Sequence, residues 1–147
     1  MPEDAIAEID ELEHPHSAAL HLKVSALFQL EDWQAAAAIC VPMTEKEPAD
    51  PSWWIQAAYA RRRSASIGEA EVLLRAGLTR HPFHPLMLYN LACYACVQGR
   101  HDEARAIFQR AASSSDTAHM LAMAAADPDL EGIRPWLLEQ VEGSARS

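Results

Sequence analysis

Glycine is scarce in this chain, and its scarcity already favours one fold class. Gly supplies 5 of the 147 residues, whereas Ala supplies 28. Alanine has the highest intrinsic helix propensity, and β-sheets rarely use so much of it. The composition therefore favours helices over sheets, in a chain long enough for one domain with a buried core.

Basic residues are also few, and this shortage argues against nucleic acid as the main partner. Lys and Arg total 12 against 21 Asp and Glu, so the net charge is −9 with neutral His. A surface this acidic repels phosphate backbones. The expected partner is therefore a protein or a peptide.

Long apolar runs and a cysteine framework are missing as well. No run of 18 apolar residues occurs, and the acidic start Met1-Pro2-Glu3-Asp4 lacks the basic region of a signal peptide. Cys40, Cys93 and Cys96 cannot all pair within the chain. We therefore expect a reduced, cytoplasmic protein with no membrane partner, present as a monomer or weak dimer.

The chain repeats itself at a constant interval. A shift of 34 places Pro51 on Pro85 and Ala58 on Ala92 without a gap. The same register continues on both sides and defines three units, 17–50, 51–84 and 85–118. A repeat of this length is typical of arrays of helix pairs.

Each unit is expected to form two helices. In the third unit, Pro85 opens the first helix, where its missing N–H costs nothing. Leu88, Leu91 and Ala95 then recur at helical spacing. Gly99 interrupts the pattern and can adopt the left-handed conformation that ends a helix. A second apolar helix follows this turn.

The third unit resembles a tetratricopeptide repeat (TPR). The residues that carry the resemblance are Leu88, Leu91, Ala92, Gly99, Ala104, Phe108 and Ala111. The unit departs from the family pattern at Ala95, where Tyr is usual, and at Asp116, where Pro is usual. The second unit matches nearly as well, through Trp54, Ala58, Ala70, Leu74 and Pro82. The first unit is degenerate, because Glu31 replaces the turn glycine and Pro42 should end or kink its second helix.

The resemblance implies an all-α fold, a right-handed α-solenoid of three helix pairs that forms a single domain over 1–147. Capping helices are expected at both ends, because a solenoid must cover its terminal faces. Residues 3–13 predict the N-terminal cap and residues 119–143 the C-terminal capping helices, which Pro135 should kink or split. Of the four tryptophans, Trp53 is the one expected to be exposed, because Trp54 occupies the inward position.

The TPR resemblance also implies a concave face, lined by the first helix of each unit, that holds a peptide or helix of a partner protein. The residues carried over to this groove are His21, Phe28, Ile55, Tyr59, Arg62, Arg63, Tyr89, Asn90, Cys93 and Cys96. Helical spacing agrees, because Ile55, Tyr59 and Arg62 share one face. Aromatic residues beside arginines are typical of binding hot spots. The alternative is that Tyr59 and Tyr89 pack between helices and that 61–63 is a solvated turn.

Two other functions remain as alternatives. The size, acidity and unit count resemble small chaperones of type III translocator subunits, which would imply a secreted client. The Cys93-Tyr94-Ala95-Cys96 spacing would suit a metal or a redox thiol pair, but both thiols lie in mid-helix and no second pair is present. The chain also lacks the common catalytic and nucleotide-binding motifs. We therefore expect no enzyme activity, no cofactor and no metal.

Overall fold

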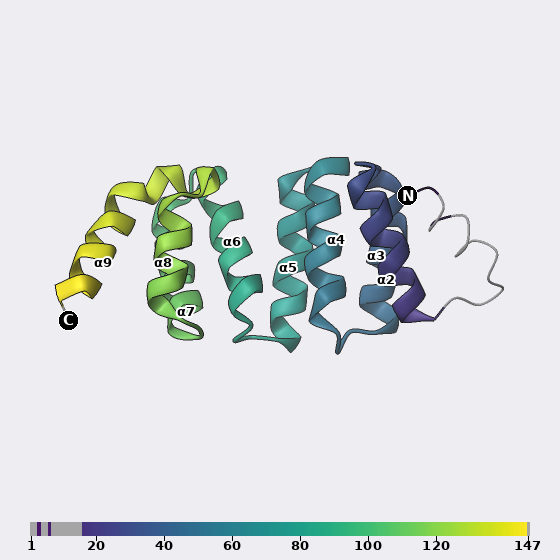
Figure 1. Ribbon diagram of the computed structural model, residues 1–147, viewed down its shortest axis with the longest axis horizontal. Helices are drawn as coiled ribbons and strands as arrows, with labels where there is room; N and C mark the ends of the chain where they lie inside the picture. The colour runs from purple at the N-terminus through teal and green to yellow at the C-terminus, as the bar shows by residue number, and fades with distance from the viewer. Residues whose placement is uncertain (1–2, 4–5, 7–15, 147) are drawn as a thin grey trace. The chain divides into compact units, whose positions relative to one another are not determined.

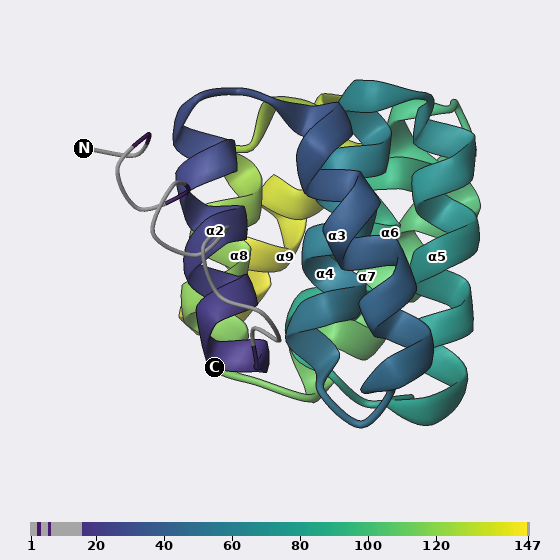
Figure 2. The ribbon, with the colours of Figure 1, turned by 90° about the vertical axis from the view of Figure 1, so that its right-hand side faces the viewer.

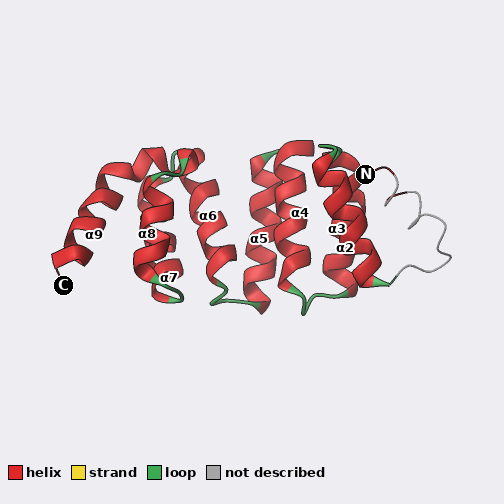
Figure 3. Cartoon of the chain, viewed as in Figure 1, coloured by secondary structure: helices red, strands yellow, loops and turns green. Residues whose placement is uncertain are grey.

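The computed structural model describes Glu3, Ile6 and residues 16–146, and all elements of this part are helices (Figure 1 and Figure 3). In chain order they are α2 (Ser17–Gln29), α3 (Trp33–Lys46), α4 (Pro51–Ser64), α5 (Ile67–Arg80), α6 (Pro85–Val97), α7 (His101–Ser113), α8 (Thr117–Ala125), the 3-10 helix η1 (Pro128–Ile133) and α9 (Arg134–Arg146). The expected all-α class is thus confirmed for the described residues. None of their helices is both long enough and apolar enough to cross a membrane.

The helices follow the period of the sequence. The first helices of the three pairs begin at residues 17, 51 and 85, and the second helices begin at 33, 67 and 101. Both sets of starts therefore recur at the interval found in the sequence. Proline explains part of this regularity, because Pro51 and Pro85 occupy first-turn positions of α4 and α6. The preceding Asp50 and His84 accept hydrogen bonds from the backbone N–H groups of Ser52 and Met87.

Equivalent turns use different residues at the same left-handed position. Gly99, after α6, has φ +84°, and Glu31, at the equivalent place after α2, has φ +57°. Gly adopts this conformation without strain, whereas a residue with a Cβ atom does so at a cost. The turn at Glu31 in the first unit is therefore strained, whereas the turn at Gly99 in the third unit is not.

Proline inside a helix has different outcomes at two places. Pro42 was expected to end or kink α3, and the first of these outcomes is wrong, because the helix continues from Trp33 to Lys46 with Pro42 in its interior. The expected split at Pro135 is confirmed, since the 3-10 helix η1 ends at Ile133 and α9 starts at Arg134. Pro135 lies in the first turn of α9, where its missing N–H breaks no helical bond.

The chain forms two compact units, residues 1–73 (unit 1) and 74–147 (unit 2), and their boundary falls within α5. In unit 1, α3 packs along α4, as Figure 2 shows. Its main core cluster consists of Val24, Cys40, Met43, Trp53 and Ala57. The expected exposure of Trp53 is wrong, because its side chain is completely buried.

A second cluster in unit 1 joins α2, α3 and α4 through Leu27, Ala36, Ala37 and Ala60. The half-buried Ile6 packs against it. The rest of the expected N-terminal helix, apart from Glu3, lies outside the described residues.

Unit 2 has its own core around α6, α7, η1 and α9. Large side chains that are completely or almost completely buried there include Met87, Leu88, Phe108, Leu130, Ile133 and Leu137. The Phe108 ring lies 6.2 Å from the ring of Tyr89 and 6.0 Å from that of Trp136, both in edge-to-face geometry. These aromatic contacts link α6, α7 and α9.

Candidate functional site

Unit 1 carries a half-exposed aromatic cluster built from three helices. Phe28 lies at the end of α2, Trp33 opens α3, and Tyr59 lies in the middle of α4. The ring centroids of Phe28 and Trp33 lie 5.2 Å apart, those of Phe28 and Tyr59 5.2 Å, and those of Trp33 and Tyr59 5.6 Å. These spacings lie within the range of favourable aromatic pairs. The three rings therefore form one continuous group.

Arg63 adds a positive charge to this group. Its Cζ atom lies 3.5 Å from the centroid of the Tyr59 ring and 5.2 Å from that of Trp33. Its Nη1 also donates a hydrogen bond of 3.1 Å to the backbone carbonyl of Tyr59, one helical turn earlier. The guanidinium is thus held in cation–π geometry. We call Phe28, Trp33, Tyr59 and Arg63 together the aromatic surface of unit 1.

The aromatic surface remains accessible to solvent. Tyr59 is 38% exposed, Arg63 is exposed, and Phe28 and Trp33 are half-buried. Leu30, two residues after Phe28, is also exposed at 40%. Partly exposed aromatic rings with a fixed cation provide apolar area and a charged hydrogen-bond donor at one place.

His21, another predicted groove residue, is engaged within unit 1. Its ring stacks on Trp53 with centroids 3.7 Å apart, and its Nε2 lies 3.2 Å from Asp50 Oδ2. Burial tends to raise the pKa of Asp50, but hydrogen bonds from Ser52 and the proximity of His21 outweigh it, so the pKa is lowered. Because Asp50 also caps α4, His21 braces the start of this helix.

Two further predicted residues, Ile55 and Arg62, lie on α4 and are half-buried. The sequence reasoning thus names Phe28, Tyr59 and Arg63 of the aromatic surface but omits Trp33. The sequence did contain a feature that points to Trp33, because this residue follows a helix cap at Asp32 and begins a second helix. The groove was expected to be lined only by the first helix of each unit, so a residue on a second helix was left out.

In unit 2 the predicted groove residues lie mostly in the interior. Tyr89 is 5% exposed, Cys93 is 3% exposed and Cys96 is 4% exposed, while Asn90 is half-buried. The 3-10 helix η1 packs against α6, which carries these residues. In the structure described, Tyr89, Cys93 and Cys96 therefore contribute to the core and present little surface to a partner.

Tyr89 and Cys93 meet a carboxylate that is distant in the sequence. The Tyr89 hydroxyl donates a 2.7 Å hydrogen bond to Asp127 Oδ2, and the Cys93 thiol lies 3.8 Å from the same oxygen. Burial is the main cause that raises the pKa of Tyr89. The hydrogen bond to Asp127 and the proximity of Cys93, Asp127 and Asp129 raise it further.

The other thiols are shielded. Burial raises the pKa of Cys40 to about 12. Burial also raises the pKa of Cys96, although the backbone N–H groups of Gly132 and Ile133 donate to it and partly oppose this shift. A thiol with a raised pKa is a poor nucleophile at neutral pH. Cys96 instead ties η1 to α6.

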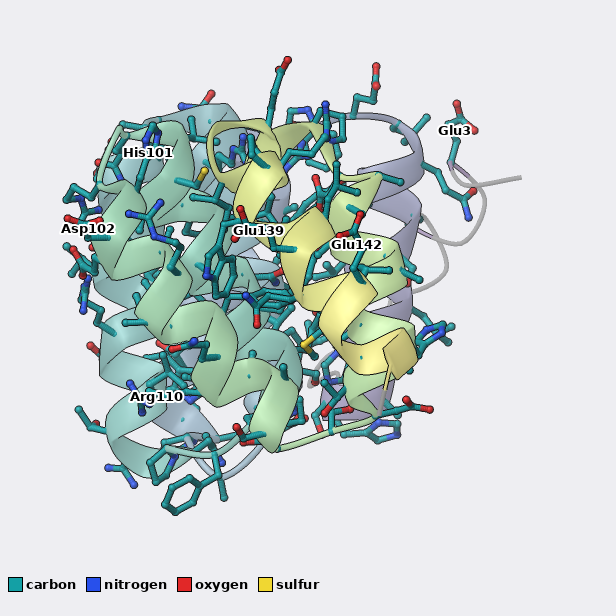
Figure 4. All side chains as sticks on the ribbon, turned by 90° about the vertical axis from the view of Figure 1, so that its left-hand side faces the viewer. Glu3, His101, Asp102, Arg110, Glu139 and Glu142 are labelled. Carbon is teal, nitrogen blue, oxygen red and sulfur yellow. The ribbon has the colours of Figure 1, made fainter. Side chains whose placement is uncertain are left out.

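Unit 2 also contains an open cavity of about 560 Å³ between α7, α8 and α9. Figure 4 shows this side of the unit, with Arg110 labelled on α7 and Glu139 and Glu142 on α9. Phe108, Leu121 and Trp136 give the cavity an apolar part, and side chains such as Gln109, Ser113 and Gln140 give it an uncharged polar part. No feature of the sequence pointed to this cavity, because its shape depends on how the last helices diverge.

No protein-family model, curated protein or solved structure was found to match the chain.

Proposed function

We propose that the chain is a non-enzymatic protein-interaction module of the TPR kind, which binds a peptide or helix of a partner protein at the aromatic surface of unit 1. The observation that carries this proposal is the grouping of three rings from three helices under one fixed guanidinium. The recurrence of helix starts at a constant interval supports the TPR kind.

Tyr59 is the expected energetic centre of binding. Its ring is already held by Phe28, Trp33 and Arg63, so a partner side chain that covers its exposed part would cost little conformational entropy on the protein side. Covering the exposed part of Tyr59 and Leu30 removes apolar surface from water, at roughly 25 cal/mol per Å². Such rigid aromatic anchors commonly dominate interface energetics.

Arg63 defines the chemistry of the partner segment. In a chain of net charge −9, a cation fixed above exposed rings favours a carboxylate next to an apolar or aromatic side chain. We therefore expect the partner segment to combine an aromatic or large aliphatic residue with a neighbouring Asp or Glu.

The test is selection of binders from a random peptide library displayed on phage, with the full-length protein as bait. Selected peptides are then synthesised and titrated by fluorescence anisotropy. We expect Tyr59→Ala to weaken binding roughly 30-fold or more, as for other hot-spot aromatics. Arg63→Ala should weaken binding of acidic peptides more than that of their amide analogues.

Phe83→Ala provides the matched control. Phe83 is an aromatic residue of unit 2, 75% exposed, in the turn before α6, and it is no part of the aromatic surface of unit 1. Circular dichroism would verify that each variant is folded. Equal losses in Tyr59→Ala and Phe83→Ala, or no loss in Tyr59→Ala, would contradict the proposal.

A further inference from the structure

Unit 2 brings a thiol and two carboxylates together at a place that the proposed function does not use. Cys93 lies on α6, Asp127 caps η1, and Asp129 lies in the first turn of η1. Each residue offers one ligand atom, and these three atoms all lie within 4.8 Å of one another. We propose that Cys93, Asp127 and Asp129 form a binding site for a thiophilic divalent cation of the Zn²⁺ class.

The distances are close to those that such an ion needs. Zn–S and Zn–O bonds of about 2.3 and 2.1 Å at tetrahedral angles place a sulfur and an oxygen ligand roughly 3.6 Å apart. Cys93 Sγ and Asp127 Oδ2 are 3.8 Å apart. The ligand oxygen of Asp129 lies within 4.8 Å of both, so a small closing movement of this side chain would complete a three-ligand face.

The ligand set selects the class of metal. A thiolate favours Zn²⁺ and its chemical analogues Co²⁺ and Cd²⁺ over Mg²⁺ and Ca²⁺, which prefer oxygen ligands alone. Three protein ligands leave a fourth position for water. Because Asp127 and Asp129 are half-buried while Cys93 is buried, that position lies on the side of the carboxylates, nearer to solvent.

Neighbouring groups hold the ligands in place. Asp127 Oδ1 accepts a hydrogen bond from the backbone N–H of Asp129 at 3.0 Å, which fixes the Asp127 carboxylate relative to the start of η1. The Tyr89 hydroxyl donates to Asp127 Oδ2 and orients this carboxylate from outside the ligand set. Hydrogen bonds of this kind contribute to affinity at metal sites.

Binding involves proton exchange without any redox change. The Cys93 S–H loses its proton to solvent, the thiolate binds the divalent ion, and both carboxylates bind already ionised. The ion, one thiolate and two carboxylates have a summed charge of −1. Because the thiol is the ligand that loses a proton on binding, one proton should be released for each ion bound at neutral pH.

The test is titration of the metal-free full-length protein with Co²⁺, followed by displacement with Zn²⁺. We expect a near-ultraviolet thiolate-to-cobalt charge-transfer band that saturates at one ion per chain and disappears on addition of Zn²⁺. Calorimetry in buffers of different ionisation enthalpy should give about one proton released per ion.

Variants identify the ligands. Cys93→Ser should abolish the charge-transfer band, and Asp129→Asn should weaken Co²⁺ binding at least 10-fold while the protein stays folded. Tyr89→Phe should weaken binding about 10-fold, as is typical of outer partners of metal ligands. Cys96→Ser is the matched control, because it removes a thiol three residues away on the same helix, and it should retain the band.

Several outcomes would overturn the proposal. These are the absence of the band in the wild type, its persistence in Cys93→Ser, its loss in Cys96→Ser, or unchanged binding in Asp129→Asn. If Cys93→Ser does not fold, comparison of Asp129→Asn with Cys96→Ser still tests whether the ion binds at this site. Cobalt bound by His81 or His84 would give no thiolate band and would also count against the site.

Discussion

Tyr59 in unit 1 and Tyr89 in unit 2 both lie on the first helix of a helix pair, yet their surroundings differ. Tyr59 is 38% exposed beneath Arg63, whereas Tyr89 is 5% exposed and donates a hydrogen bond to Asp127. In unit 2, η1 packs on α6 in addition to α7. The comparison teaches that a first-helix tyrosine becomes a surface or a core residue according to what the chain later folds over it.

The largest expected effect comes from truncating the two tyrosines. Tyr89→Ala removes a buried ring and the hydroxyl that donates to Asp127 Oδ2, so it should lower the free energy of unfolding by about 4 kcal/mol. Tyr59→Ala removes a partly exposed ring and should cost about 1 kcal/mol. Urea denaturation followed by circular dichroism measures both. Similar losses would show that the two residues do not differ in burial as described.

Alkaline pH should destabilise the protein through Tyr89. Burial and the neighbouring negative charges raise the pKa of Tyr89, so the folded protein retains a proton that the unfolded chain loses above about pH 10. The free energy of unfolding should therefore fall as pH rises beyond 10, by up to about 1.4 kcal/mol per pH unit. Tyr89→Phe should reduce this slope, leaving the part that comes from the buried thiols Cys40 and Cys96, whose pKa values are also raised. Tyr59→Phe should leave the slope unchanged, as shown by urea midpoints between pH 9 and 11. A slope in Tyr89→Phe as steep as that of the wild type would contradict the assignment.

Substitutions at the equivalent turn positions of the two units should change the free energy of unfolding by smaller amounts and in opposite directions. Glu31→Gly relieves a left-handed non-glycine residue and should stabilise the protein by about 1 kcal/mol. Gly99→Ala introduces the same strain and should destabilise it by about 1 kcal/mol. Thermal unfolding would show a higher midpoint for the first variant and a lower one for the second. Two shifts of the same sign would refute the argument from the turns.

The smallest expected effect is acid sensitivity in unit 1. The pKa of Asp50 is lowered in the folded state, because hydrogen bonds from Ser52 and the proximity of His21 outweigh the effect of burial. The stability from this shift is present above the unfolded-state pKa of about 3.9 and is lost as pH falls through the lower folded-state value. Asp50→Asn should flatten the loss of stability below about pH 4. Acid titration followed by tryptophan fluorescence tests this, with Asp32→Asn, another helix cap, as the control.

Much of the fold could be predicted from the sequence. The repeat period correctly anticipated that helices begin at residues 17, 51 and 85, because proline, capping residues and apolar spacing act locally. Gly99 was predicted to permit a left-handed turn and does so. By contrast, Pro42 was expected to end or kink α3, and the helix does not end there, since the surrounding packing can hold a helix together across one missing hydrogen bond.

The candidate site was only partly predictable. Spacing correctly placed Ile55, Tyr59 and Arg62 along one helix, but it could not say which faces later elements cover. Trp53 was assigned to the surface from its neighbour Trp54, yet both are buried, because His21 stacks on Trp53 from another helix. Spacing within one helix does not reveal contacts made by a second helix.

The sequence by itself determined that this chain is helical, where its helix pairs begin and which turn requires a left-handed residue, because propensity, capping and turn chemistry depend on near neighbours. Tertiary structure alone decided that Tyr59 stays accessible, that Tyr89 is covered, and that Cys93 meets Asp127 and Asp129. The Tyr89–Asp127 hydrogen bond joins residues 38 positions apart. Such contacts arise from burial of apolar faces between elements, and no local pattern specifies which faces those will be.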